Sequence, residues 1–260
     1  MSVDLLKLLA ANRGRGVEAR VVKGFKPVNY DPDGDGDQDE PGLPDDDEAT
    51  VYVYDVIGDW GVGAESFVKA VSAIKAKTIH LRINSPGGDV MAARAMMTAL
   101  RNHSATVVAH VDGLSASAAS FLMLAADEIE ITDGAFVMIH NPSTVAWGDA
   151  REMRKTAALL DKVRDASAND YAARTGKSYD ELVAMMDAET WMTAQEAVAG
   201  GFADRVVDGA KPQQRFDLSV YDNAPAALTA PPAEANCDAE LEAARARQLR
   251  LASLYARQPA

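Results

Sequence analysis

The sequence of 260 residues lacks several features that define whole classes of protein. Cys237 is its single cysteine, so a disulfide within the chain is excluded and a reducing compartment is favoured. No apolar run approaches the roughly 20 residues that a membrane-spanning helix needs. The short apolar stretch near the N-terminus has no basic region before it, so no secretory signal peptide is expected. These absences predict a protein of the cytoplasm that does not interact with membranes.

Basic residues are outnumbered by acidic ones: the sequence has 26 Lys and Arg and 39 Asp and Glu, which gives a net charge of −13. A chain without a basic face cannot neutralise phosphates, so nucleic acid is not an expected partner. Ten of the carboxylates lie in residues 31–48, which contain no Lys or Arg, and the rest of the chain carries a net charge of only −3. The acidity therefore belongs to one segment and says little about the function of the remaining chain.

Patterns that hold metals or nucleotides are also missing. The four histidines do not have metal-ligand spacing, and there is no Cys/His cluster. Asp31-x-Asp33-x-Asp35-Gly36 resembles the start of a calcium loop, but its twelfth position is Gly42 rather than a bidentate Glu. The glycine-rich segments lack the P-loop lysine and the dinucleotide pattern. We expect no metal and no cofactor.

Composition divides the chain into three regions. Residues 1–50 contain a leading segment and the acidic, Pro/Gly-rich tract, which cannot bury enough apolar surface to fold. Residues 51–208 alternate between strand-like and helix-like patterns and predict the folded domain. Residues 209–260 predict a polar linker and an Ala/Arg-rich tail with a surface helix over 238–256.

The central region follows a β/α pattern. Apolar runs predict strands over residues 51–57, 78–83, 106–111, 135–139 and 204–207. Helical patterns predict helices over residues 64–74, 89–101 and 148–174, and the small-residue run 114–126 predicts a helix that starts near Ser117. Two capping boxes, Ser178-x-x-Glu181 and Thr193-x-x-Glu196, begin two short helices. Strands that alternate with helices indicate the α/β class, with a mostly parallel sheet covered by helices.

Residues able to perform chemistry follow three of these strands, where reactive groups gather in parallel α/β folds. Ser117 lies near the start of a helix, where free backbone N–H groups and the helix dipole can stabilise an oxyanion. His140 precedes a proline at the end of a strand, and Pro86-Gly87-Gly88 lets the backbone approach a substrate closely. Each also fits a structural role: a packed helix, a structural histidine and an ordinary turn.

Taken together, these segments resemble the ClpP family of serine peptidases, and above all its phage and prophage members, the head-maturation proteases. The resemblance covers about residues 51–208. It rests on segments 83–88 (INSPGG), 113–118 (GLSASA) and 137–142 (VMIHNP), on Tyr54-Asp55-x-Ile57-Gly58, and on segments 189–197 (ETWMTAQEA) and 201–204 (GFAD).

The resemblance implies a role for each matching residue. Ser117 matches the nucleophile and His140 the general base, while Ser115 is a distant second candidate for the nucleophile. The backbone N–H groups of Gly87 and Ala118 match the oxyanion hole. A strand beginning at Gly88-Asp89 matches the edge along which the substrate peptide lies extended.

The third member of the triad is where this sequence departs from the family. The family acid is an Asp two residues before the aromatic residue at the position of Trp191, and here that position is Glu189. A glutamate can orient the histidine as an aspartate does. Asp187, two residues earlier, is the alternative acid and requires a local shift of the chain.

The resemblance also implies a fold and a biological role. The fold is the ClpP/crotonase type, with repeated β-β-α units and a long protruding handle helix at about residues 148–174. The implied function is endopeptidase cleavage of phage capsid or scaffolding proteins by a ring-like homo-oligomer, in the bacterial host cytoplasm or the assembling prohead. Two alternatives stay open: a catalytically inert capsid-assembly or scaffolding protein, and an acyl-CoA enzyme of the same fold, against which the Ser/His pair counts.

Overall fold

The structure is a computed structural model that describes residues 21–23, 47–59, 61–209 and 216–229. Its contacts divide the chain into two units, residues 1–225 and residues 226–260, and the second is described only for the short helix α8, Ala226–Thr229. The predicted acidic linker, the calcium-like segment and the predicted helix at 238–256 lie almost wholly outside the described residues.

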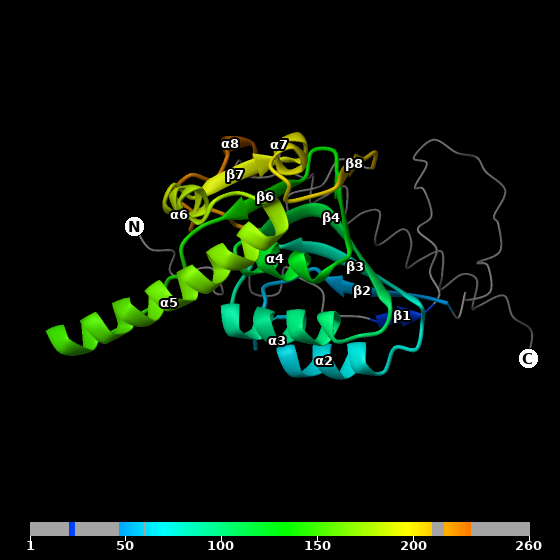
Figure 1. The fold of residues 1–260 in the computed structure, drawn as a ribbon, viewed down its shortest axis with the longest axis horizontal. Coiled ribbons are helices and arrows are strands. Elements are labelled where there is room, and N and C mark those ends of the chain that lie inside the picture. The colour runs from blue at the N-terminus through cyan, green and yellow to red at the C-terminus, as the bar shows by residue number, and fades with distance from the viewer. Residues whose placement is uncertain (1–20, 24–46, 60, 210–215, 230–260) are drawn as a thin grey trace, which may run out of the picture. The chain divides into compact units, whose positions relative to one another are not determined.

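One mostly parallel sheet organises the first unit (Figure 1). Its main path runs in the order β1-β2-β3-β4-β5-β8, with β2, β3, β4, β5 and β8 parallel and β1 antiparallel to β2. Off this path, β6 pairs parallel with β4, and β7 pairs antiparallel with β6. The strands are β1 Val21–Lys23, β2 Glu48–Val53, β3 Thr78–Ser85, β4 Thr106–Ala116, β5 Glu128–Thr132, β6 Phe136–Ile139, β7 Thr190–Thr193 and β8 Arg205–Val207. The predicted α/β class with a mostly parallel sheet is confirmed.

Polar side chains define where several helices begin. Asp89, Asp149, Ser178 and Thr193 each accept hydrogen bonds from the first backbone N–H groups of the helix that follows. Thr193 and Glu196 form the complete capping box that was predicted, whereas Glu181 binds Lys177. The helices are α2 Ala64–Ser72, α3 Val90–Arg101, α4 Ala118–Leu122, the 3₁₀ helix η1 Met123–Ala125, α5 Ala150–Thr175, α6 Tyr179–Asp187 and α7 Ala194–Ala199.

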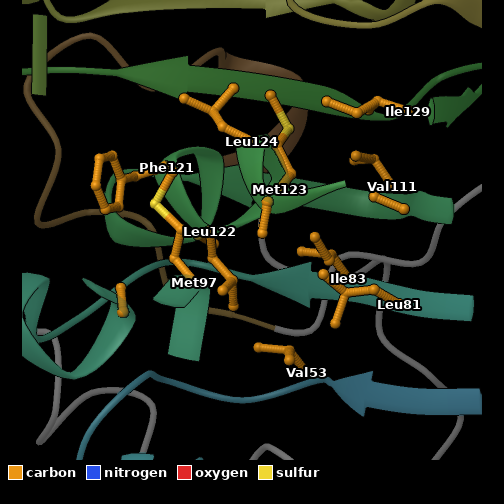
Figure 2. Close-up of a cluster of buried hydrophobic side chains, with 14 of the residues drawn as sticks. Val53, Leu81, Ile83, Met97, Val111, Phe121, Leu122, Met123, Leu124 and Ile129 are labelled. Atoms are coloured by element: carbon orange, nitrogen blue, oxygen red, sulfur yellow. The ribbon is translucent and has the colours of Figure 1, made fainter. Parts of the chain in front are cut away.

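The two faces of the sheet differ because side chains alternate along each strand. On β3, Ile79, Leu81 and Ile83 are fully buried and belong to the hydrophobic core with residues of α3, α4 and η1 (Figure 2). Each such side chain contributes about 1.5–3 kcal/mol when fully buried. The intervening residues are polar, and His80 and Arg82 contact His110 and Asp112 of β4. One face of the sheet therefore packs against the hydrophobic core, and the other face carries a network of polar side chains.

The extent of β4 differs from the sequence-based prediction and is central to the site. Asp112-Gly113 was expected to end this strand, but β4 continues to Ala116 because its second half pairs with β6 instead of β5. The predicted helix over 114–126 is reduced to α4 and η1, and β5 and β7 were not predicted. The long β4 carries the chain directly to Ser117.

The long helix predicted over residues 148–174 is present as α5 and ends at Gly176 in the left-handed conformation (φ 72°). Its N-terminal half extends away from the sheet (Figure 1). Trp147, just before it, is 85% exposed, and Val145 and Leu159 are also exposed. The first unit thus carries a projecting helix with accessible apolar side chains.

The folded unit continues beyond residue 208, the end predicted from the sequence. Phe216, Leu218 and Tyr221 are buried, and the first unit extends to residue 225. Residues 216–223, which we call the C-terminal strap, were expected to be part of a polar linker.

Candidate active site

Ser117 occupies a strained turn between β4 and α4. Its backbone has φ 54° and ψ −123°, and its N–H donates to the carbonyl oxygen of Met138. A non-glycine residue in such a conformation costs about 1–3 kcal/mol, and strain of this kind concentrates at functional sites. The geometry is that of a strand-to-helix nucleophile turn, which presents a serine hydroxyl at the start of a helix.

His140 lies beside this serine because β4 and β6 are neighbours in the sheet. Ala116 pairs with Met138, so the residues that follow the two strands emerge at the same edge. The Ser117 Oγ lies 2.7 Å from the His140 Nε2. The structure therefore unites the two residues that were predicted from separate strand ends.

The protonation state of His140 suits a base. Burial lowers the pKa of His140 to about 4 from an ordinary value of 6.5, and the nearby Glu189 carboxylate acts in the opposite direction. The imidazole is therefore neutral at pH 7, and the tautomer with its proton on Nδ1 would leave Nε2 free to accept the serine proton.

Of the two candidate acids, Glu189 is the one whose charge acts on the pKa of His140. Thr190 of β7 pairs with Ile139 of β6, and continuing this antiparallel register by one residue brings Glu189 across from His140. Glu189 also has a positive φ of 48°, and among the described non-glycine residues only Ser117 shares this feature. Asp187 instead accepts a hydrogen bond from Asn141 Nδ2 at 2.6 Å.

The predicted oxyanion-hole residues lie next to Ser117. A Cβ on Gly87 would come within 2.7 Å of the Ser117 Cβ and 3.0 Å of the Ala118 nitrogen, so only glycine fits here. Ala118 is the first residue of α4, and its N–H has no acceptor within the helix. The Gly87 N–H donates to Ser85 Oγ at 3.2 Å, a bond that it must exchange to bind an oxyanion.

The expected substrate-binding strand at Gly88-Asp89 needs correction, because no strand begins there. The Asp89 side chain caps α3 by accepting from the N–H groups of Met91 and Ala92, which turns the chain into a helix at once. Gly88 forms a single parallel bridge with Ile57. The Gly87 carbonyl and the Asp89 N–H bind Ile57, so the alternation of an extended chain directs the Gly88 N–H and carbonyl to the opposite side.

A pocket opens beside the Ser117 hydroxyl. It is lined by Val90, Ser117, Ala118, Phe121, His140, Pro142, Ser167 and Tyr171. Ser115 does not line it and is fully buried, which sets the second nucleophile candidate apart from the pocket. The pocket therefore provides space next to the Ser117 hydroxyl and the His140 ring.

Sequence reasoning missed Tyr221, a residue of the C-terminal strap that borders this site. Its ring contacts His140 edge to face at 5.5 Å between ring centroids, and its hydroxyl donates to the Pro86 carbonyl at 2.5 Å. The spacing Phe216-x-Leu218-x-x-Tyr221, apolar within a polar stretch, is the signal that could have indicated a packed segment.

Comparison with known proteins adds to this geometry. The Clp protease family matches residues 64–210, more than half of the chain. The chain belongs to the Clp protease family. This membership confirms the ClpP-type fold and the family resemblance that the motifs indicated; the match does not extend to a phage head-maturation type.

Two relatives within the family illustrate the likeness. The ATP-dependent Clp protease proteolytic subunit 1 of Protochlamydia amoebophila (strain UWE25) is 35% identical over 136 residues, which is 51% of this chain and 66% of the relative. An ATP-dependent Clp protease proteolytic subunit of Bacteroides fragilis is 35% identical over 133 residues, 50% of this chain and 64% of the relative. This chain thus spans slightly less than two thirds of the length of these curated relatives.

The described ranges also bear on membrane and metal sites. None of the helices in these ranges is both long and apolar enough to cross a bilayer. Within the same ranges, His, Cys, Asp and Glu side chains form no group of three or more with the arrangement of metal ligands.

Proposed function

We propose that this member of the Clp protease family is a serine endopeptidase in which Ser117 attacks the peptide bond and His140 is the general base. The observation that carries the proposal is the 2.7 Å contact between Ser117 Oγ and His140 Nε2, at a strained serine that begins a helix. Glu189 is proposed as the acid, because its charge acts on His140 and the β6–β7 register brings it near the ring.

The proposed reaction is acyl transfer in two steps. His140 Nε2 removes the Ser117 proton as Oγ bonds to the carbonyl carbon, and the resulting oxyanion binds the N–H groups of Gly87 and Ala118. His140 then gives the proton to the leaving amine as the C–N bond breaks. Water hydrolyses the acyl-enzyme by the same route, with His140 again as the base.

The substrate backbone has a partner in this arrangement. The Gly88 N–H and carbonyl, which point away from Ile57, can pair with an extended peptide lying across Ser117. Asp89 contributes to this edge indirectly, because its cap on α3 holds the chain after Gly88 in place.

A more specific proposal concerns the substrates of this peptidase and its assembly. We infer that the substrates are phage capsid or scaffolding proteins, cleaved in the bacterial cytoplasm or the assembling prohead, on the strength of the head-maturation motifs. We further propose a ring-like homo-oligomer. Trp147, which is 85% exposed beside the projecting α5, supports self-association because tryptophan is enriched at protein–protein interfaces, and Val145 and Leu159 are further exposed apolar residues on this part of the chain.

A fluorophosphonate probe tests the chemistry, because it reacts with activated serine hydroxyls. The wild-type protein should be labelled and the Ser117→Ala variant should not. Ser115→Ala is the matched control, since it removes a neighbouring buried hydroxyl and should leave labelling unchanged. Equal labelling of wild type and Ser117→Ala would move the nucleophile elsewhere.

The substrate proposal needs a separate experiment. Capsid and scaffolding components co-expressed with the wild-type chain should acquire new N-termini, detected by mass spectrometry, and these termini should be absent with Ser117→Ala. Assembly of intact components with either chain would favour the inert assembly protein instead.

A further inference from the structure

The C-terminal strap lies outside the residues that match the Clp protease family, because the match ends at residue 210. It nevertheless packs into the first unit through buried Phe216, Leu218 and Tyr221. The strap thus lies outside the matched residues and still reaches the proposed nucleophile and acid. These contacts indicate that it has a role in the site.

Tyr221 connects three separate parts of the site. Its ring contacts His140 edge to face and Trp191 in the same way, at 5.7 Å between centroids. Its hydroxyl donates to the carbonyl oxygen of Pro86, next to Gly87, and lies within interaction range of Ser117. Burial raises the pKa of Tyr221, so this hydroxyl stays protonated and keeps its donor function.

The two residues after Tyr221 bind the proposed acid. The Asn223 N–H donates to Glu189 Oε1 at 2.8 Å, and the Asp222 N–H lies 3.3 Å from Glu189 Oε2. Trp191 Nε1 donates to the same carboxylate at 3.1 Å. Asn223 Nδ2 also donates to the Ala188 carbonyl, which joins the strap to the turn that carries Glu189.

The strap does not block the pocket beside Ser117. The Ser117–His140 contact is formed with the strap in place, and both residues still line the open pocket. No strap residue is among those that line this pocket. The strap approaches from the side of Pro86 and Glu189, so its contacts support the reacting groups without filling the space for a substrate side chain.

We propose that Tyr221 is a positioning residue, which fixes the His140 ring and the Pro86-Gly87 loop, while the Asp222 and Asn223 amides hold Glu189 in place. This inference rests on the proposed peptidase function. It makes the strap part of the active site of this chain, and it assigns a function to residues that the family match does not include.

The surroundings of His140 define what a variant should change. The titratable groups around it are Glu189 before β7, Tyr171 of α5 across the pocket, Tyr221 of the strap and Asp187 of α6 through Asn141. Removing the Tyr221 ring opens His140 to water while leaving the other groups in place. Water access should raise the pKa of His140 towards its ordinary value.

The test measures the rate of fluorophosphonate labelling against pH for the full chain, Tyr221→Phe and Tyr221→Ala. Tyr221→Phe keeps the ring, so the rate should fall several-fold through loss of the Pro86 bond while the acid midpoint stays in place. Tyr221→Ala should be at least tenfold slower, with its midpoint moved to higher pH. Tyr179→Ala is the control, because Tyr179 lies at the surface and binds Asp165.

Each other outcome is decisive. Labelling of folded Tyr221→Ala faster than wild type would overturn the proposal in favour of an inhibitory cover. If Tyr221→Ala does not fold, Tyr221→Phe decides alone, and a rate within twofold of wild type rejects positioning while the peptidase function stands. A wild-type chain that is not labelled at all rejects the peptidase function, and the inference with it.

Discussion

Two half-buried histidines, His110 and His140, invite comparison, because each has a lowered pKa and polar partners. His110 on the polar face of the sheet lies 2.8 Å from the Glu130 carboxylate through Nδ1 and 2.9 Å from His80 through Nε2. Burial, followed by the charges of Arg82, His80 and Arg205, lowers the pKa of His110 to about 3. His140 has a comparable pKa of about 4. By pKa alone, the two sites cannot be told apart.

The two histidines differ in the group that the Nε2 atom contacts. His140 Nε2 contacts a serine hydroxyl at a strained turn, beside the first residue of a helix and an open pocket. His110 Nε2 meets another histidine, and its neighbours on adjacent strands are charged pairs such as Arg82–Asp112. A shifted pKa therefore reports burial, and a nucleophile with space for a substrate is what indicates catalysis.

Removing each imidazole ring in turn should give the largest difference between the two histidines. His140→Ala should lower the labelling rate or peptide turnover by about 10⁴-fold or more, as loss of the base does in other triads. His110→Ala should leave the rate nearly unchanged in protein that remains folded. Near-normal activity of His140→Ala would remove it as the base.

The acid should show the next largest effect. Glu189→Gln should lower turnover by about 100-fold or more, because the imidazolium loses its neighbouring negative charge. Asp187→Asn, the matched control, should have little effect because Asp187 binds Asn141. Equal activity of both variants and wild type would indicate a Ser–His dyad.

The pH profile gives a smaller effect that distinguishes the two histidines. Since the active form of His140 is neutral, labelling should rise with pH through a midpoint near 4 and not near 6.5. Glu189→Gln should move the midpoint to lower pH, because the Glu189 charge raises the pKa of His140. His110→Gln should leave it unchanged, and a midpoint that follows the His110 variant would contradict the assignment.

The smallest effect on activity is expected from His110→Gln, which should change labelling by less than about twofold while stability falls. The variant removes the contact of His110 Nδ1 with Glu130 Oε2, while Arg205 still binds Glu130 Oε1, so the loss should be about 0.5–1.5 kcal/mol, the usual net contribution of one hydrogen bond. Urea unfolding should report this as a lower midpoint with an unchanged slope. An equal loss of activity and stability would mean that the polar face supports catalysis.

Much of the fold and the core of the candidate site could be predicted from the sequence. Periodicity located α2, α3 and α5, and apolar runs located β3 and β6, because these patterns depend on local geometry. Ser117 and His140 follow two predicted strands, and the family motifs assigned them the roles of nucleophile and base together with Gly87, Ala118 and Glu189.

Other features depended on contacts between distant residues. Asp112-Gly113 has the composition of a turn, yet β4 continues through it because β6 supplies a second pairing partner. The Gly88-Asp89 segment was expected to be a strand, and the cap on α3 prevents this. The pairing of β4 with β6 leaves no signal in the local sequence. The Asp89 cap, by contrast, lies within three residues of its partners, and the expectation of a strand came from the family resemblance and not from the local sequence.

Local sequence was enough to show which chemical groups are present and at which strand ends they emerge, because side-chain alternation and helix capping act over a few residues. The three-dimensional arrangement was needed to show that Asp187 binds Asn141, that the Glu189 charge acts on His140, and that Tyr221 reaches the site from a segment predicted to be a linker. Those relations arise from sheet register and long-range packing, which join residues up to 135 positions apart.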